Sequence, residues 1–253
     1  MSVLKKIIYG LLIGWLGAFS LLTSSAQADG VTNIVMTGSD RQADGSGQSD
    51  STLVVSYNEG TGQVSLISLP QNLMISIPEQ GEGTLAEAYS IGGGQLVADG
   101  IEEWTDASID DYLTLDMAGV AELIDEVGGV TVYVSESFEQ DGYSFQEGDT
   151  LTMDGSQALA YMRHLPQEGE LVSKQERQAQ VIRSLGEELA GEDLSAFGYI
   201  KLYQNYSGYI DSSLGKMEMI NLVKELIQSG SGLSYHELDE QTTPDQLQML
   251  LQS

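Results

Sequence analysis

Two aspartates frame a glycine- and serine-rich segment near the start of the chain. Asp40 follows an apolar, β-branched stretch, and Asp50 precedes a second one. The segment from Gly38 to Ser51 predicts a loop between two strands, and ligands of open α/β sheets lie beyond the carboxyl ends of strands. Two carboxylates suit Mg²⁺, which keeps several of its waters. The spacing is consistent with a magnesium site. The alternative is an ordinary turn, where Asp, Ser and Gly are common.

A second group of residues has the character of an anion site. Ser173 and Glu176 have the spacing of a capping box, which predicts a helix beginning at Lys174. Three residues then share one face of its first two turns: Lys174, Arg177 and Gln178. Cations near a helix start are unfavourable unless an anion is bound there. With Arg163 nearby, the pattern indicates a phosphate site. The alternative is surface charge paired with neighbouring glutamates, at little energetic gain.

Alternating elements must position these residues. Apolar patterning predicts strands at 31–37, 52–57, 63–69, 73–77, 112–115, 130–134 and 233–238. It predicts helices at 85–89, 95–104, 117–127, 156–162, 174–190, 194–206, 214–228 and 244–251. The order favours an α/β fold with helices on both faces of a mixed sheet.

Composition limits the function classes. The 253 residues include 38 acidic and 10 basic side chains, for a formal net charge of −28. That charge argues against nucleic acid as a partner, because phosphates require clustered Lys and Arg. The absence of cysteine excludes disulfides, thiolate metal sites and cysteine nucleophiles. For most of the acidic side chains we expect a solvated surface.

The amino terminus has the marks of an export signal. Lys5 and Lys6 precede an apolar run over residues 7–22, and an Ala-x-Ala site ends at Ala28. The run is close to the minimum length of a membrane-spanning helix, so an uncleaved anchor is the alternative to cleavage. We therefore expect residues 1–28 to be a signal peptide or anchor and residues 29–253 to be an extracytoplasmic domain.

Two further features favour structural roles. His164 has no second histidine nearby, which favours a hydrogen-bonded structural histidine over a metal pair. The tyrosines from Tyr199 to Tyr209 have nearly helical spacing at first, which is more typical of core or groove lining than of a cofactor site.

Six stretches in order resemble the LytR–CpsA–Psr family. They are residues 33–51, 66–70, 88–93, 123–134, 154–164 and 176–178. The resemblance implies a three-layer α/β/α sandwich with a central mixed sheet. It implies an extracytoplasmic phosphotransferase, membrane-anchored or secreted, that moves an anionic glycopolymer such as teichoic acid or capsule from a polyprenyl-pyrophosphate carrier to peptidoglycan. It also implies an apolar pocket for the lipid and Mg²⁺ at the pyrophosphate.

Roles carry over to matching positions. Asp40 and Asp50 match the metal-site aspartates, and both are expected to take part in catalysis together with Arg163 and Arg177. The residues expected to hold phosphate are Arg41, Gln71, Arg163, Lys174, Arg177 and Gln178.

The chain departs from the family pattern at several cations. The family's Pro-Arg-Asp is Pro70-Gln71-Asn72, its second arginine after the Ala-x-x-Tyr segment is Leu165, and an expected lysine is Thr84. Gln42 replaces another arginine, although Arg41 is adjacent. Each lost cation removes a charge-assisted contact worth about 1.5–3 kcal/mol. Three hypotheses therefore stay open: an active phosphotransferase, a homologue that binds the carrier lipid without turnover, and a non-enzymatic wall-surface interaction protein.

Overall fold

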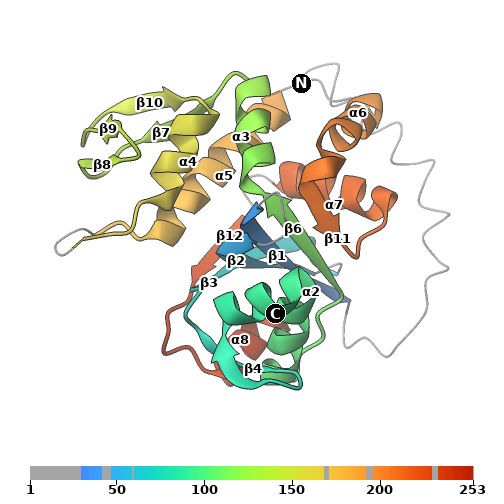
Figure 1. The fold of residues 1–253 in the computed structure, drawn as a ribbon. Coiled ribbons are helices and arrows are strands. Elements are labelled where there is room, and N and C mark those ends of the chain that lie inside the picture. The colour runs from blue at the N-terminus through green and yellow to red at the C-terminus, as the bar shows by residue number, and fades with distance from the viewer. Residues whose placement is uncertain are drawn as a thin grey trace. The chain divides into compact units, whose positions relative to one another are not determined.

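A six-stranded mixed sheet forms the centre of the computed structural model (Figure 1). The structure describes residues 30–41, 47–58, 60–167, 171–191, 196–229 and 233–252, so the expected export segment lies outside the described residues. The strand order is β11-β6-β1-β2-β3-β12. These strands are β1 (Val31–Arg41), β2 (Gly47–Asn58), β3 (Gln63–Leu69), β6 (Asp111–Asp116), β11 (Ile210–Ser212) and β12 (Leu233–Glu237).

The pairing directions make this sheet mixed. β1 runs parallel to β6, and β3 runs parallel to β12. The β1–β2, β2–β3 and β6–β11 pairs are antiparallel. Strand β1 is therefore paired on both sides from Ile34 to Ser39, whereas Asp40 and Arg41 at its carboxyl end extend beyond β6 and pair with β2.

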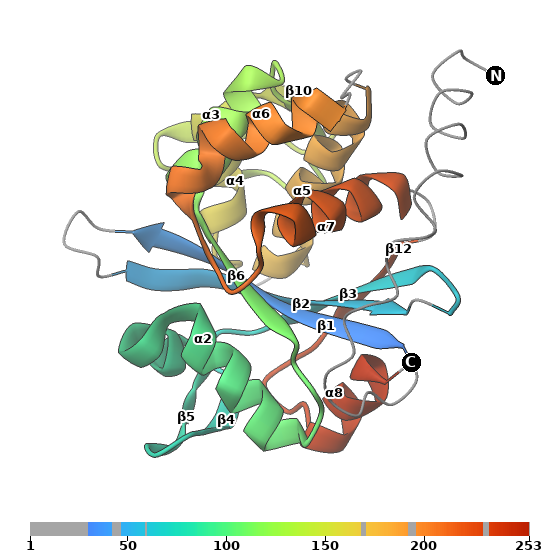
Figure 2. The same cartoon turned by 90° about the vertical axis from the view of Figure 1, so that its right-hand side faces the viewer.

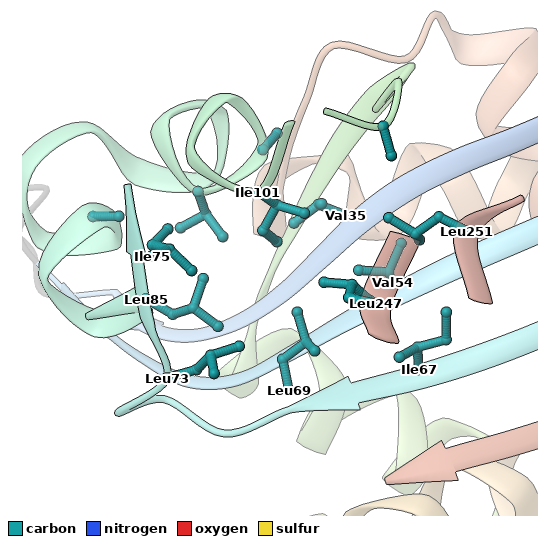
Figure 3. Packing of buried hydrophobic residues seen from close by; sticks show 14 of the residues in the cluster. Val35, Val54, Ile67, Leu69, Leu73, Ile75, Leu85, Ile101, Leu247 and Leu251 are labelled. Atoms are coloured by element: carbon teal, nitrogen blue, oxygen red, sulfur yellow. The ribbon is translucent and has the colours of Figure 1, made fainter. Parts of the chain in front are cut away.

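One face of the sheet packs on helix α2 (Leu85–Thr105), helix α8 (Pro244–Leu251) and the hairpin of β4 (Met74–Ile77) and β5 (Gly81–Thr84). Figure 3 shows apolar side chains from the strands and both helices meeting in this layer, Val35, Val54 and Ile67 among them. Their neighbours Ile34 and Val55 belong to a cluster on the opposite face. This alternation is the period of two that a strand buried on both faces requires.

The other face carries the remaining helices, as Figure 2 shows. They are α3 (Met117–Glu126), α4 (Gly155–Arg163), α5 (Lys174–Gly191), α6 (Ala196–Tyr206) and α7 (Lys216–Ser229), with the short helix η1 (Ser207–Tyr209). Beside α4 and α5 lie two small sheets, formed by β7 (Val130–Tyr133) with β10 (Thr150–Met153) and by β8 (Phe138–Gln140) with β9 (Tyr143–Phe145). The predicted three-layer α/β/α sandwich is confirmed.

Helix α2 shows why the predicted break between two helices was correct. Gly92 and Gly93 have non-helical backbone angles inside this element, and Gly93 has φ +65°. Gly94, the next residue, lies so close to β6 that a Cβ atom would approach the Thr114 hydroxyl to 2.6 Å. The three glycines thus serve a left-handed turn and a close approach to the sheet.

The predicted loop from Gly38 to Ser51 was wrong at both ends. Strand β1 continues to Arg41, and β2 begins at Gly47, because the two strands keep pairing beyond an irregularity between Gly38 and Ser39. Within the described ranges, no helix combines the length and apolarity needed to cross a bilayer.

Candidate active site at the carboxyl end of β1

Asp40 and Arg163 meet at the carboxyl end of β1. Arg163 is the last residue of α4, and its Nη2 donates to Oδ1 of Asp40 over 2.5 Å. The side chain of Arg163 is 33% exposed and that of Asp40 is 47% exposed. The contact joins residues 123 positions apart, so the fold itself brings the two sequence motifs together. A half-exposed carboxylate beside a one-third-exposed guanidinium is an arrangement that an entering anion or metal ion can reach.

Asp50 lies on the strand beside Asp40. Ser49 pairs with Ser39 and Ser51 pairs with Gly38, so the backbone of Asp50 forms the extra residue of a β-bulge. The side chains of Asp50 and Arg41 lie outside the described part of the structure. Among the described residues, no group of three or more His, Cys, Asp or Glu side chains could hold a metal ion.

The start of α5 confirms the predicted helix beginning. The amide of Glu176 donates to the Ser173 hydroxyl over 2.9 Å, as an N-cap requires. The three residues that were predicted to share one face of this helix differ in burial. Lys174 is half-buried, whereas Arg177 is only 1% exposed and Gln178 only 7% exposed.

Arg177 is enclosed by groups that the sequence did not single out. Its Nη1 donates to the Val172 carbonyl over 2.7 Å, and its Nη2 lies 3.3 Å from Oε2 of Glu136. Its guanidinium carbon lies 4.6 Å from the centre of the Phe138 ring. Glu136 stands between β7 and β8, 41 positions before Arg177, in a segment without a recognisable motif. Sequence spacing alone gave no signal for this pair.

His164 follows Arg163 and is buried, as a structural histidine should be. Its ring stacks on Phe138 at 4.1 Å between centroids, and its Nδ1 lies 3.4 Å from Oε1 of Gln140. Phe138 thus contacts both the His164 ring and the Arg177 guanidinium, and it joins the end of α4 to the start of α5.

The family match decides the relationship of this chain to known proteins. The model described as the LytR_cpsA_psr family matches residues 18–249. The chain belongs to the LytR–CpsA–Psr family. The resemblance seen in the six motifs is therefore confirmed.

Proteins similar in sequence include teichoic acid transferases. A polyisoprenyl-teichoic acid–peptidoglycan teichoic acid transferase TagU of Enterococcus faecalis is 33% identical over 229 residues, covering 83% of this chain and 75% of the relative. A TagU of Oceanobacillus iheyensis is 34% identical over 62% of this chain. The chain spans about half (51%) of that relative's length.

Solved structures share the fold. Bacillus subtilis TagV superposes with a TM-score of 0.67 at 22% identity, covering 84% of this chain and 86% of that one. A structure of TagT bound to LI-WTA gives a TM-score of 0.64 at 20% identity, covering 86% of this chain and 82% of that one. These likenesses confirm the mixed α/β architecture of a LytR–CpsA–Psr protein.

Three departures from the LytR–CpsA–Psr pattern have partners within the fold. Gln71 donates its amide to the Ser49 carbonyl, next to the β-bulge. Asn72 donates to Oε1 of Glu240 over 2.8 Å. Thr84 is the N-cap of α2 and forms a complete capping box with Glu87. Leu165, by contrast, is 68% exposed.

The end of the tyrosine-rich segment packs beside α3, with the phenols of Tyr206 and Tyr209 hydrogen-bonded at the surface rather than in the core. Tyr206 donates to Glu126 over 2.6 Å, and Tyr209 donates to Glu122 over 2.8 Å. Desolvation, followed by the hydrogen bond to Glu126, raises the pKa of Tyr206. These phenols therefore stay protonated at neutral pH and serve as hydrogen-bond donors. Tyr199 lies in a part of α6 whose side chains are not described.

Proposed function

We propose that the chain transfers an anionic glycopolymer from a polyprenyl-pyrophosphate carrier to peptidoglycan. The observation that carries this proposal is the contact of Arg163 with Asp40 at the carboxyl end of β1. It occurs in a chain of the LytR–CpsA–Psr family, whose relatives include transferases of teichoic acid to peptidoglycan. Both residues come from motifs that the family resemblance linked to the metal and the phosphates.

In the proposed reaction, a hydroxyl of a wall sugar attacks the phosphorus that carries the polymer. A new phosphorus–oxygen bond forms, the bridging bond of the pyrophosphate breaks, and polyprenyl monophosphate leaves. The proton of the attacking hydroxyl goes to an aspartate carboxylate, for which Asp40 is placed at an accessible position. Arg163 and Lys174 hold phosphate oxygens and stabilise the charge that develops on them.

We propose that Asp40 and Asp50 would hold Mg²⁺. Magnesium in phosphoryl-transfer sites takes one or two carboxylates, with waters and substrate phosphates completing the octahedron. Asp40 supplies one accessible carboxylate, and Asp50 lies on the adjacent strand at the β-bulge. When bound, the ion would neutralise charge on the pyrophosphate and polarise its phosphorus–oxygen bonds.

A second candidate function is binding of the carrier lipid without turnover. Four observations favour it: Gln71 and Asn72 are engaged with backbone or side chains of the fold, Thr84 caps a helix, and Leu165 carries no charge. The loss of cations at Gln71, Thr84 and Leu165 most weakens the stabilisation of charge that develops in the transition state. A non-enzymatic wall-surface protein is the third alternative, and it requires no phosphate ligand.

For the location we propose the outer side of the cell membrane. The basic start and apolar run of residues 1–28 support export, by a retained anchor or a cleaved signal. The partners would be the lipid carrier and peptidoglycan, with no role for nucleic acid in view of the net charge of −28.

The deciding experiment combines two assays on purified residues 29–253, with and without Mg²⁺. One measures binding of a polyprenyl pyrophosphate, and the other measures release of the polyprenyl phosphate product in the presence of an acceptor glycan. Mg²⁺-dependent binding with product release supports the transferase. Binding without product favours the carrier-binding homologue, and no binding contradicts both.

A further inference from the structure

We infer that Glu136 is a positioning residue, which acts through Arg177 and Val172 to place the start of α5 at the site. This inference rests on the proposed function where it gives Lys174 and Gln178 a phosphate to bind. Neither the motifs nor the family resemblance assigned a role to Glu136.

Both carboxylate oxygens of Glu136 make contacts with the segment before α5 or with Arg177. One carboxylate oxygen, Oε2, accepts from the Val172 amide over 3.0 Å and lies 3.3 Å from Nη2 of Arg177. The other, Oε1, accepts from the amide of Leu171. A single side chain from the β7–β8 connection thus binds two successive backbone amides and a guanidinium.

Arg177 holds the same segment through the carbonyl group of Val172. Its Nη1 donates to the carbonyl of Val172 over 2.7 Å. Val172 is therefore held at both backbone groups, by Glu136 at its N–H and by Arg177 at its C=O. Because Val172 directly precedes the N-cap Ser173, this fixes where α5 begins.

Both side chains of the Arg177–Glu136 pair are largely buried. Arg177 is 1% exposed and covered by the Phe138 ring, and its partner Glu136 is only 18% exposed. A guanidinium enclosed in this way cannot reach a phosphate without breaking its ion pair inside the protein. Lys174 lies one turn earlier on the same helix and is half-buried, so it remains the residue that can contact an anion. Arg177 then acts through the backbone rather than on the substrate.

The charge pattern of the pair predicts unequal variants. Glu136→Gln leaves a buried guanidinium without its counter-charge. The NH₂ group of the new glutamine is a donor, and it would face at least one of the donors that Glu136 accepts from. Arg177→Met leaves the Glu136 carboxylate with its two backbone donors. Removing one partner of a buried pair is more harmful than removing both. We therefore expect Glu136→Gln to be more damaging than Arg177→Met and the double variant to be no worse than Glu136→Gln.

The test measures farnesyl pyrophosphate binding and amide exchange, at a temperature where circular dichroism shows every variant folded. We expect Glu136→Gln to speed exchange at the Leu171 and Val172 amides and to weaken binding about tenfold or more, since small misplacements are costly. Glu136→Asp keeps the charge and should restore part of both. The matched control is Glu139→Gln, an exposed glutamate on β8, which should change neither.

A double-mutant cycle separates positioning from general stability. If Glu136 acts by placing the helix start, Lys174→Ala should weaken binding much less in the Glu136→Gln background than in the wild type. Additive effects, unchanged amide exchange, or tighter binding by Glu136→Gln would overturn the inference, the last because it would show Arg177 to be a phosphate ligand. If the wild type binds no pyrophosphate, the proposed function fails, while amide exchange at Leu171 and Val172 still decides whether Glu136 holds the segment.

Discussion

Arg163 contacts the Asp40 carboxylate in the structure and, in the proposed reaction, also holds a phosphate group. Asp40 and a phosphate group compete for the same guanidinium, and a metal ion competes with Arg163 for Asp40. Binding of the metal should therefore release Arg163 for the phosphate, and binding of the phosphate should release Asp40 for the metal. Such coupling is reciprocal by thermodynamic necessity.

Replacement of this arginine gives the first prediction. Arg163→Ala should lower the affinity for farnesyl pyrophosphate about ten- to a hundredfold, because one charge-assisted contact is worth about 1.5–3 kcal/mol. Calorimetric titration in the presence of Mg²⁺ measures it. Arg183→Ala removes an exposed arginine of α5 and serves as the control. Equal affinities for the two variants would contradict a phosphate role for Arg163.

Thr84 shows how a departure from the family pattern can serve the fold. The resemblance expects a lysine there, yet the threonine hydroxyl accepts from the Glu87 amide, and the Glu87 carboxylate accepts from the Thr84 amide. The hydrogen bonds to Thr84 lower the pKa of Glu87. Thr84 therefore begins α2, and this role in the fold does not depend on a contact with substrate.

The second prediction follows from this cap. Thr84→Ala should lower the free energy of unfolding by about 1 kcal/mol, the usual cost of a lost N-cap, with farnesyl pyrophosphate affinity unchanged. Urea denaturation and a binding titration measure the two quantities. Thr84→Ser keeps the hydroxyl and should stay near the wild type. A large loss of affinity in Thr84→Ala with normal stability would place Thr84 at the ligand instead.

At the candidate site, sequence motifs singled out Asp40 and Arg163 as candidates but did not indicate their surroundings. Asp40 and Arg163 were predictable because each belongs to a motif with a recognisable spacing. Glu136 was not, since a lone glutamate between two short strands has no periodic signal, and its contact with Arg177 depends on the packing of distant segments. Burial of Arg177 was equally hidden, because helical spacing places it on the same face as Lys174.

Among the elements, the start of β6 carries the clearest pH dependence. Desolvation raises the pKa of Asp111, even though the Ser213 hydroxyl donates to its carboxylate over 2.7 Å. An acid whose pKa is raised on folding adds stability that is complete below its unfolded pKa. That stability is lost as the pH rises through the folded pKa. At neutral pH the ionised Asp111 therefore weakens this end of the strand.

The third prediction uses the uncharged analogue. Asp111→Asn should be more stable than the wild type at pH 7, and the difference should shrink as the pH falls towards 4. Thermal unfolding across this pH range measures it. Asp149→Asn, in the exposed connection between β9 and β10, removes the same charge from the surface, so an effect of net charge alone would appear in both variants. A difference that grows on acidification would contradict the assigned cause.

Element prediction succeeded where the pattern was long. Strand β3 and helix α8 begin and end as predicted, because a hairpin turn bounds the first and a proline start marks the second. The three-residue strands β8, β9 and β11 were missed, since so few residues cannot display alternation. The ends of β1 and β2 were missed because glycine and serine gave no strand signal and only pairing keeps them extended.

For the whole molecule, the layer architecture was predictable, whereas the strand order was not. Alternating patterns imply a mixed sheet with helices on both faces. The parallel pairs β1–β6 and β3–β12 join segments that lie far apart in the sequence, and no local pattern specifies them. Register at these pairs comes from which apolar faces fit together in the two layers of the core.

The net charge of −28 gives the last prediction, which concerns stability in salt. Self-repulsion among so many carboxylates opposes the compact state, and salt screens it over a distance of about 8 Å at physiological ionic strength. Raising NaCl from low to molar concentration at pH 7 should therefore raise Tm. A gain of about 1–2 kcal/mol corresponds to roughly 2–8 °C for a domain of this size. Because the sequence pI is about 4.1, the same titration near pH 4.5 should show a smaller rise, which separates charge screening from general effects of salt on apolar surface. A Tm that is flat or falling with salt at pH 7 would mean that the acidic side chains are arranged so that they do not repel one another in the folded state.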